Sequence, residues 1–338
     1  MKKMKQLLFS ICLLLSILAR PLGLAGQGNG TLHLILSIDE YNEDIRKGCI
    51  EDREYLSSIF EWIAEDAGMS YRPYNVGFSP GDVYGFMDEF TCGPNDAVIF
   101  FYSGHGFREE DDNVIWPFLY YCEKNEQAGI NGSLQDCGVP LDWIHQMLIS
   151  KHPRMSLTIG NSCNEVPGNE QANQMAQGLK KQKTDQPGEN SFSHLELLTR
   201  FKGHIIASGA SPGQFSYTTD DDGSYFVNGL VDVLVEDLFI AEQPTSWASI
   251  LKKTRDIVQQ QKPDQRPQFL IVKDNKKLLF SEGAENFQYK PSYEQMGLEV
   301  PDISDEDEFD YEDDYDSWEV DGLDDEDYGE EWESDYDE

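Results

Sequence analysis

The stretch Asp96-Ala-Val-Ile-Phe-Phe-Tyr-Ser-Gly-His-Gly-Phe107 contains the features that decide the fold. Its apolar part, residues 97–102, is short and almost uninterrupted, which is typical of a strand buried on both faces of a parallel sheet. The run ends at Ser103-Gly-His-Gly106, where the two glycines allow the backbone to turn sharply. Open α/β sheets place their active sites at the carboxyl ends of such strands. His105 is therefore a candidate active-site residue.

A second apolar run, residues 155–159, also ends in polar residues, Gly160-Asn-Ser-Cys-Asn164. The carboxyl ends of parallel strands meet at one edge of a sheet, so His105 and Cys163 are expected to face one another. In arbitrary positions, such residues would more often be a hydrogen-bonded loop histidine and a small buried hydrophobe. Here each follows an apolar strand, and 58 residues separate them (163 − 105), close to the roughly 50 that one group of cysteine peptidases uses. This spacing favours a catalytic pair.

Strands and helices are expected to alternate along the rest of the chain. Strands are predicted at 31–38, 69–76, 203–208 and 267–272, and helices at 46–67, 79–90, 141–149, 192–201, 224–240 and 246–261. Pro73 restricts the second of these strands to a sheet edge. Alternating strands and helices indicate parallel βαβ units. We predict one α/β domain, an α/β/α sandwich around a mostly parallel sheet of about six strands.

The N-terminus has the features of a secretory signal peptide. A basic start, Met-Lys-Lys-Met-Lys5, precedes an apolar run at 7–19 and a small-residue exit at 21–25. The apolar run is short for a membrane span, and no other stretch is suited to one. We therefore expect residues 1–25 to be removed and the protein to be secreted or periplasmic, without a stable membrane span.

The chain is strongly acidic, above all at its end. Its 338 residues carry a formal net charge of −37, and residues 302–338 hold 22 Asp and Glu but no Lys or Arg. This charge opposes binding to nucleic acid and to anionic membranes. Residues 286–338 are expected to form a disordered tail because like charges repel. Interleaved aromatic residues leave two roles open, docking to a basic surface or simple solubilisation.

Five cysteines remain after the predicted signal peptide, an odd number that leaves at least one free thiol in an exported protein. Cys122 and Cys137 flank a loop containing Gly and Asn and are the pair most readily bridged, although other pairings stay open at this point. The His and Cys spacings do not indicate zinc.

Three motifs together resemble the caspase-like cysteine peptidases, and most of all their metacaspase branch. They are Phe100-Phe-Tyr-Ser-Gly-His-Gly106, Asn161-Ser-Cys163 and Arg46-Lys-Gly-Cys-Ile-Glu-Asp52. The resemblance covers roughly residues 31–272, and the Gly48-Cys-x-x-Asp52 match indicates the metacaspase branch. It implies a caspase-like sandwich, with residues 26–285 as a peptidase domain acting on protein or peptide substrates.

The resemblance also implies a role for each residue of the catalytic site. Cys163 would be the nucleophile, and His105 the general base that later protonates the leaving amine. The backbone N–H groups of Gly106 and Cys163 would form the oxyanion hole. The sequence does not identify a third catalytic residue, and caspase-like enzymes generally work with two.

The residues that the resemblance assigns to substrate binding are Cys49, Asp52, Asn161 and Ser208. Metacaspases carry acids in the primary specificity pocket and cleave after Arg or Lys. Asp52 matches one of these acids, whereas Asn161 replaces the other with an uncharged side chain. We therefore expect a weakened preference for basic residues. The alternative is that Asp52 is an ordinary exposed acid on a helix.

Other interpretations remain open. Residues 207–214 and 223–226 resemble the loop and helix that complete the substrate cleft in caspase-like enzymes, or form a plain strand-to-loop exit and a Ser-capped helix. Many metacaspases need calcium, for which Asp111, Asp112 and Asp136 are available, but no cofactor is required by the motifs. Asn161 and the unusual Asn164-Glu165 also suit an inactive caspase-like module that binds peptides or partner proteins. A third option is another branch of the His-Gly/Cys peptidases.

Overall fold

The computed structural model describes residues 30–109, 114–122, 134–166, 195–219, 222–239, 245–273 and 276–280. All of them belong to one unit, Met1–Glu299. The predicted signal peptide and acidic tail lie outside the described residues and stay predictions.

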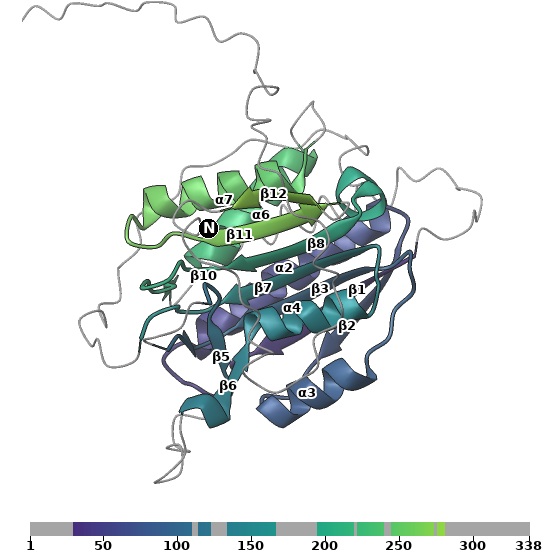
Figure 1. The fold of residues 1–338 in the computed structure, drawn as a ribbon. Helices are drawn as coiled ribbons and strands as arrows, with labels where there is room; N and C mark the ends of the chain where they lie inside the picture. Colours follow the sequence, from purple (N-terminus) through teal and green to yellow (C-terminus); the bar gives the residue numbers. More distant parts are fainter. Residues whose placement is uncertain are drawn as a thin grey trace, which may run out of the picture. The chain divides into compact units, whose positions relative to one another are not determined.

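A seven-stranded sheet forms the centre of this unit (Figure 1). Its strands, in spatial order, are β2 (Ser70–Asn75), β1 (Thr31–Ile38), β3 (Ala97–Ser103), β7 (Met155–Asn161), β8 (Gly203–Ser208), β11 (Gln268–Lys273) and β12 (Lys276–Phe280). The first five are parallel, while β11 and β12 run antiparallel to their neighbours. The predicted mostly parallel sheet is confirmed, with Pro73 on the edge strand β2; β12 is a strand that we did not predict.

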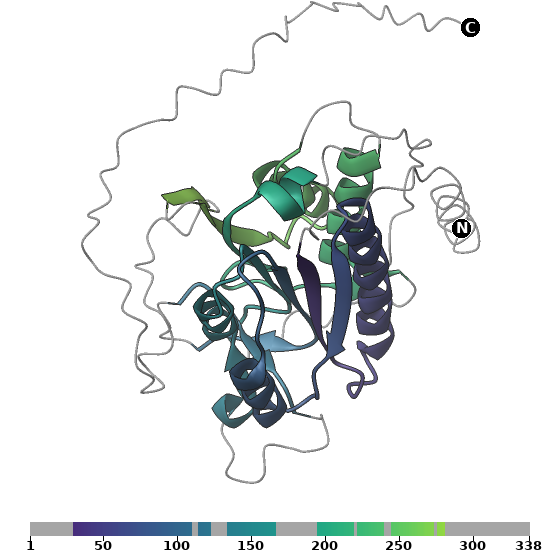
Figure 2. The ribbon, with the colours of Figure 1, turned by 90° about the vertical axis from the view of Figure 1, so that its right-hand side faces the viewer.

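Helices cover both faces of the sheet, which confirms the three-layer architecture (Figure 2). One face packs against α2 (Arg46–Asp66), α6 (Tyr225–Phe239) and α7 (Trp247–Gln261), and the other against α3 (Pro80–Glu89) and α4 (Leu141–Ser150). Along β3, Ile99 and Phe101 enter the first core, whereas Val98 and Phe100 enter the second. The uninterrupted apolar run follows from this burial on both faces.

Local sequence signals set several helix boundaries. The hydroxyl of Ser79 accepts a hydrogen bond from the N–H of Asp82 at the start of α3, and Ser246 caps α7 in the same way. The predicted helix at 192–201 differs from expectation: its described part, Leu195–Arg200, is a π-helical turn. The side chains of Trp247 and Arg154 donate hydrogen bonds to the carbonyls of Leu197 and Leu198 in this turn.

The register of the parallel strands brings their carboxyl ends to one edge. Ile38 pairs with Ser103, Ser103 with Asn161, and Gly160 with Ser208. The loops after β1, β3, β7 and β8 therefore begin side by side, where open α/β sheets form their sites.

Short elements that the sequence did not indicate complete this edge. β4 (Gly106–Phe107), β5 (Phe118–Tyr120) and β6 (Gly138–Pro140) form a small antiparallel sheet, with the 3-10 turn η1 (Leu134–Cys137) leading into β6. β9 (Thr218–Thr219) and β10 (Gly223–Ser224) form a two-stranded ladder before α6. Across the ranges that the structure describes, no helix is both long and apolar enough to cross a membrane.

Candidate active site

The loop after β3 runs alongside the loop after β7, so the structure brings the segments of His105 and Cys163 together. The N–H of Gly104 donates to the carbonyl of Asn161 at 3.3 Å, and that of Arg108 to Glu165 at 3.1 Å. A Cβ atom on Gly106 would lie 2.8 Å from the carbonyl oxygen of Cys163 and 2.6 Å from the Cβ of Ser162. A residue with a side chain could not approach so closely, which explains the glycine after His105.

The thiol of Cys163 contacts the loop that follows β8. Its Sγ atom lies 3.7 Å from the carbonyl oxygen of Ser216, to which it donates a weak hydrogen bond. Burial raises the pKa of the Cys163 thiol to about 11; the Ser216 contact opposes this rise, and the charge of Glu165 adds to it. The resting form at neutral pH is thus the thiol, and a base is needed to form the thiolate.

The imidazole of His105 faces an acid that the sequence analysis missed. Its Nε2 atom lies 3.9 Å from Oδ1 of Asp44, and both side chains are more than a third exposed. Between His105 and Cys163 themselves, within the part of the chain that the structure describes, no hydrogen bond is formed. Four acids occur between Asp39 and Asp44, and no sequence pattern distinguishes the one that contacts the histidine.

Asp52 is the centre of a buried hydrogen-bond network. Its carboxylate accepts from the Ser103 hydroxyl at 2.8 Å, from the Asn161 amide at 2.9 Å and from the N–H of Ser224 at 2.7 Å. Asp52 is only 1% exposed, so the alternative interpretation of Asp52 as an ordinary exposed acid on a helix is wrong. Two residues that the sequence analysis assigned to substrate binding, Asp52 and Asn161, are in direct contact.

Burial dominates the electrostatics of this network. It raises the pKa of Asp52 to about 7, although the three hydrogen bonds favour the charged form. Cys49, one helical turn earlier, is also buried, and its thiol pKa is raised by burial and further by the negative charge of Asp52. Cys49 is a free, buried thiol, and its role in substrate binding stays a prediction.

The network extends to the candidate nucleophile through Ser216. The Ser216 hydroxyl donates to Oδ1 of Asn161 at 2.9 Å, while its carbonyl accepts from the Cys163 thiol. The buried amide of Gln265 lies 3.2 Å from the same hydroxyl and 2.9 Å from the carbonyl of Gly209. Ser216 and Gln265 were not identified from the sequence because each lies in an irregular segment between elements.

Ser208 lies at the end of β8, fully buried. Its hydroxyl donates to the carbonyl of Ala210 at 3.0 Å and lies 3.4 Å from the N–H of the same residue. The structure thus places Ser208 in the turn that follows β8, and its role in substrate binding stays a prediction.

The possible calcium dependence stays a prediction. Asp111 and Asp112 lie outside the described residues, and Asp136 is exposed. In the described ranges, His, Cys, Asp and Glu side chains do not gather in any group of three or more suited to a metal ion.

The fold and the facing His and Cys loops are those of a caspase-type cysteine peptidase domain. A sequence model of the caspase domain matches residues 31–279, well over half of the chain. The chain therefore belongs to the caspase family, whose members include cysteine peptidases acting on proteins. No curated protein is significantly similar to the chain.

The raised pKa of Asp52 predicts how stability depends on pH. Its folded pKa of about 7 exceeds the ordinary 3.8, so the stabilisation it contributes is complete below pH 4 and is lost as the pH rises through 7. We expect Asp52→Asn to gain stability relative to the wild type across this range, by up to about 4 kcal/mol. Urea unfolding at pH 4 to 8 measures the difference.

The matched control is Glu54→Gln, which removes a charge from the exposed side of the same helix. It should follow the wild-type pH dependence. The same pH dependence in both variants would show that Asp52 is not the buried group responsible.

Proposed function

We propose that this protein is an exported cysteine endopeptidase of metacaspase character that cleaves peptide bonds after Arg or Lys. The observation that carries the proposal is the continuous hydrogen-bonded path from the buried Asp52 carboxylate through Asn161 and Ser216 to the thiol of Cys163. This path links the candidate nucleophile to a carboxylate that suits the binding of a basic substrate side chain.

The proposed reaction begins with a neutral thiol. His105 takes the proton of Cys163, the sulfur forms a bond to the scissile carbonyl carbon, and the N–H groups of Gly106 and Cys163 stabilise the oxyanion. The imidazolium then gives its proton to the leaving amine as the C–N bond breaks. Water, activated by the same imidazole, hydrolyses the thioester and restores the thiol. Catalytic contacts are often long in free enzymes, which is consistent with the separation of the two side chains at rest.

The charge of Asp52 supports a preference for basic residues. Of the described Lys and Arg side chains, none forms an ion pair with this buried carboxylate. A cationic substrate side chain would supply the missing counter-charge, and a buried charge is far less costly when it is paired. Binding of that cation would favour the ionised acid, so the preference should strengthen as the pH rises through about 7.

The packing of α2 supports the metacaspase assignment. A Cβ atom on Gly48 would lie 1.9 Å from Oγ1 of Thr218, so only glycine allows this close contact between α2 and β9. The contact keeps Cys49 and Asp52 against the sheet edge. This packing gives a structural reason why Gly48, Cys49 and Asp52 occur together in one motif.

Export is supported by the Cys122–Cys137 disulfide, whose Cα atoms are 5.4 Å apart, because such bonds persist in oxidising compartments. We propose a secreted or periplasmic location on this basis and on the predicted signal peptide. The acidic tail is proposed to dock a basic surface; it lies outside the described residues.

A fluorogenic peptide panel with each of Arg, Lys, Asp and Leu before the scissile bond tests the activity. We expect the mature protein to cleave after Arg and Lys and Cys163→Ala to be inactive, with parallel assays in calcium and in EDTA. Cleavage after Asp alone would overturn the specificity. A silent panel together with an unreactive Cys163 would instead support the inactive binding module.

The contact between Asp44 and His105 predicts a separate effect on the catalytic rate. Its carboxylate faces Nε2 of His105 and would stabilise the imidazolium that forms when the thiol is deprotonated. We expect Asp44→Asn to lower kcat about tenfold or more, with KM nearly unchanged. Glu43→Gln, which neutralises the neighbouring exposed acid, should leave both constants as in the wild type; an equal loss in the two variants would exclude a specific role.

A further inference from the structure

We propose that the Cys122–Cys137 disulfide positions His105 for catalysis, acting through the backbone of Tyr120. The inference rests on the proposed role of His105 as the base for Cys163. Its consequence is that the enzyme needs one cysteine pair oxidised while its nucleophilic cysteine is reduced.

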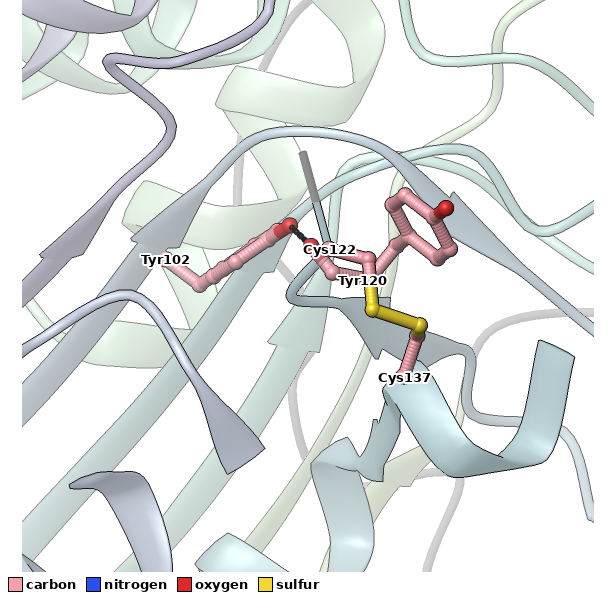
Figure 3. Close-up of a disulfide and its surroundings, with 4 residues drawn as sticks. All are labelled: Tyr102, Tyr120, Cys122 and Cys137. Atoms are coloured by element: carbon pink, nitrogen blue, oxygen red, sulfur yellow. Dashed lines mark hydrogen bonds between the residues drawn. A yellow bond between two sulfur atoms is a disulfide. The ribbon is translucent and has the colours of Figure 1, made fainter. Parts of the chain in front are cut away.

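The first step is the support of the His105 backbone. Its carbonyl oxygen accepts the N–H of Tyr120 at 3.0 Å. The hydroxyl of Tyr102 lies 2.7 Å from this carbonyl and 2.7 Å from that of Tyr120, so it can donate to either. Figure 3 shows the contact with Tyr120. The catalytic loop is thereby fixed to β5 at the residue that carries the imidazole.

The second step links β5 to the disulfide. Cys122 follows Tyr120 by two residues and is bonded to Cys137, directly before β6. The N–H of Tyr121 donates to the carbonyl of Cys137 at 2.8 Å, and Tyr120 pairs with Gly138. Figure 3 shows the disulfide beside the Tyr120 backbone that meets the Tyr102 hydroxyl. The covalent bond thus closes the ends of β5 and β6 where Tyr120 reaches His105.

The strands of the small sheet are very short, so a covalent bond adds to the support that their buried side chains give. β4 has two residues, and β5 and β6 have three each. Ladders of this length hold their register weakly without further support. A shift of β5 would carry the N–H of Tyr120 away from His105, and an error of about 1 Å in a catalytic group costs on the order of 100-fold in rate.

The central sheet, in contrast, does not depend on the disulfide. Tyr102 is fully buried in β3, and the hydroxyl of Ser37 in β1 donates to that of Tyr121 at 3.0 Å. Leu119 of β5, Tyr121 and Val139 of β6 also lie in the second core, so burial holds the small sheet against the central one without the bond. Loss of the bond should therefore affect the position of His105 more than the fold as a whole.

The redox chemistry follows directly. A dithiol reductant that opens the bond gives two electrons and two protons to the two sulfurs, forming the thiols of Cys122 and Cys137, and becomes a disulfide itself. The same reductant keeps Cys163 in its active thiol form. Activity should thus be highest under mild reduction that spares the Cys122–Cys137 bond and fall under stronger reduction.

Alkylation of Cys163 by iodoacetamide, followed by peptide mass spectrometry, tests the inference in the full chain. The double variant Cys122→Ser/Cys137→Ser is compared with the wild type, each with His105 intact and with His105→Ala. We expect the disulfide's removal to slow alkylation about tenfold when His105 is present and to have no further effect in His105→Ala. Equal slowing in both backgrounds would show a general structural role and overturn the proposal, as would no slowing at all.

Two further variants keep the test decisive. Tyr102→Phe removes only the hydroxyl beside the His105 carbonyl and should slow alkylation in the same direction, again only with His105 present. Cys92→Ser removes a free cysteine that precedes β3, at the opposite end of the strand from His105, and should match the wild type. If the double variant does not fold, Tyr102→Phe and reduction of the native wild type give the answer, and normal alkylation in both would contradict the proposal.

The alkylation assay needs no peptide substrate, so it separates this inference from the proposed peptidase activity. A silent peptide panel with disulfide-dependent alkylation would leave the positioning role intact and remove the peptidase. In an active enzyme, the disulfide variant should show a lower kcat with KM within about twofold of the wild type.

Discussion

The site depends on the burial of one carboxylate, that of Asp52. Its three hydrogen-bond donors come from the end of β3, the end of β7 and the residue before α6, which are far apart in the chain. Burying a carboxylate is costly, and these bonds offset part of the cost while leaving the pKa near 7. Asp52 thus ties α2 to the sheet edge from which the loops of His105 and Cys163 emerge.

The parallel sheet supplies the second constraint, since its register decides which loops meet. Ser103 pairs with Asn161, so the loops of His105 and Cys163 start from the same level of the sheet. Gly106 then allows its loop to lie against the backbone of Cys163. His105 and Cys163, the candidate base and nucleophile, each lie two residues beyond the end of a rigid strand, which limits how far their loops can move.

The sequence predicted the strands and helices in which a pattern of buried residues extends over many positions. It missed the strands and contacts that depend on only a few residues. The runs before His105 and Cys163 identified β3 and β7 because both faces of each strand are buried, and the helices predicted to begin at Ser79 and Ser246 are capped by those residues in the structure. The strands β4, β5 and β6 are too short to show any periodicity. The contacts of Asp44 and Ser216 depend on how distant loops fold together, which no local pattern records.

The central claim is that the buried charge of Asp52 and the thiol of Cys163 act as one site for basic residues. The most direct measurement is labelling of the wild-type protein at pH 8 with two peptidyl chloromethyl ketones, ending in Arg or in Asp, followed by mass spectrometry of the cysteine peptides. We predict rapid modification of Cys163 by the Arg reagent and slow modification by the Asp reagent. Equal rates, or labelling of Cys49 or Cys92 in place of Cys163, would contradict the account.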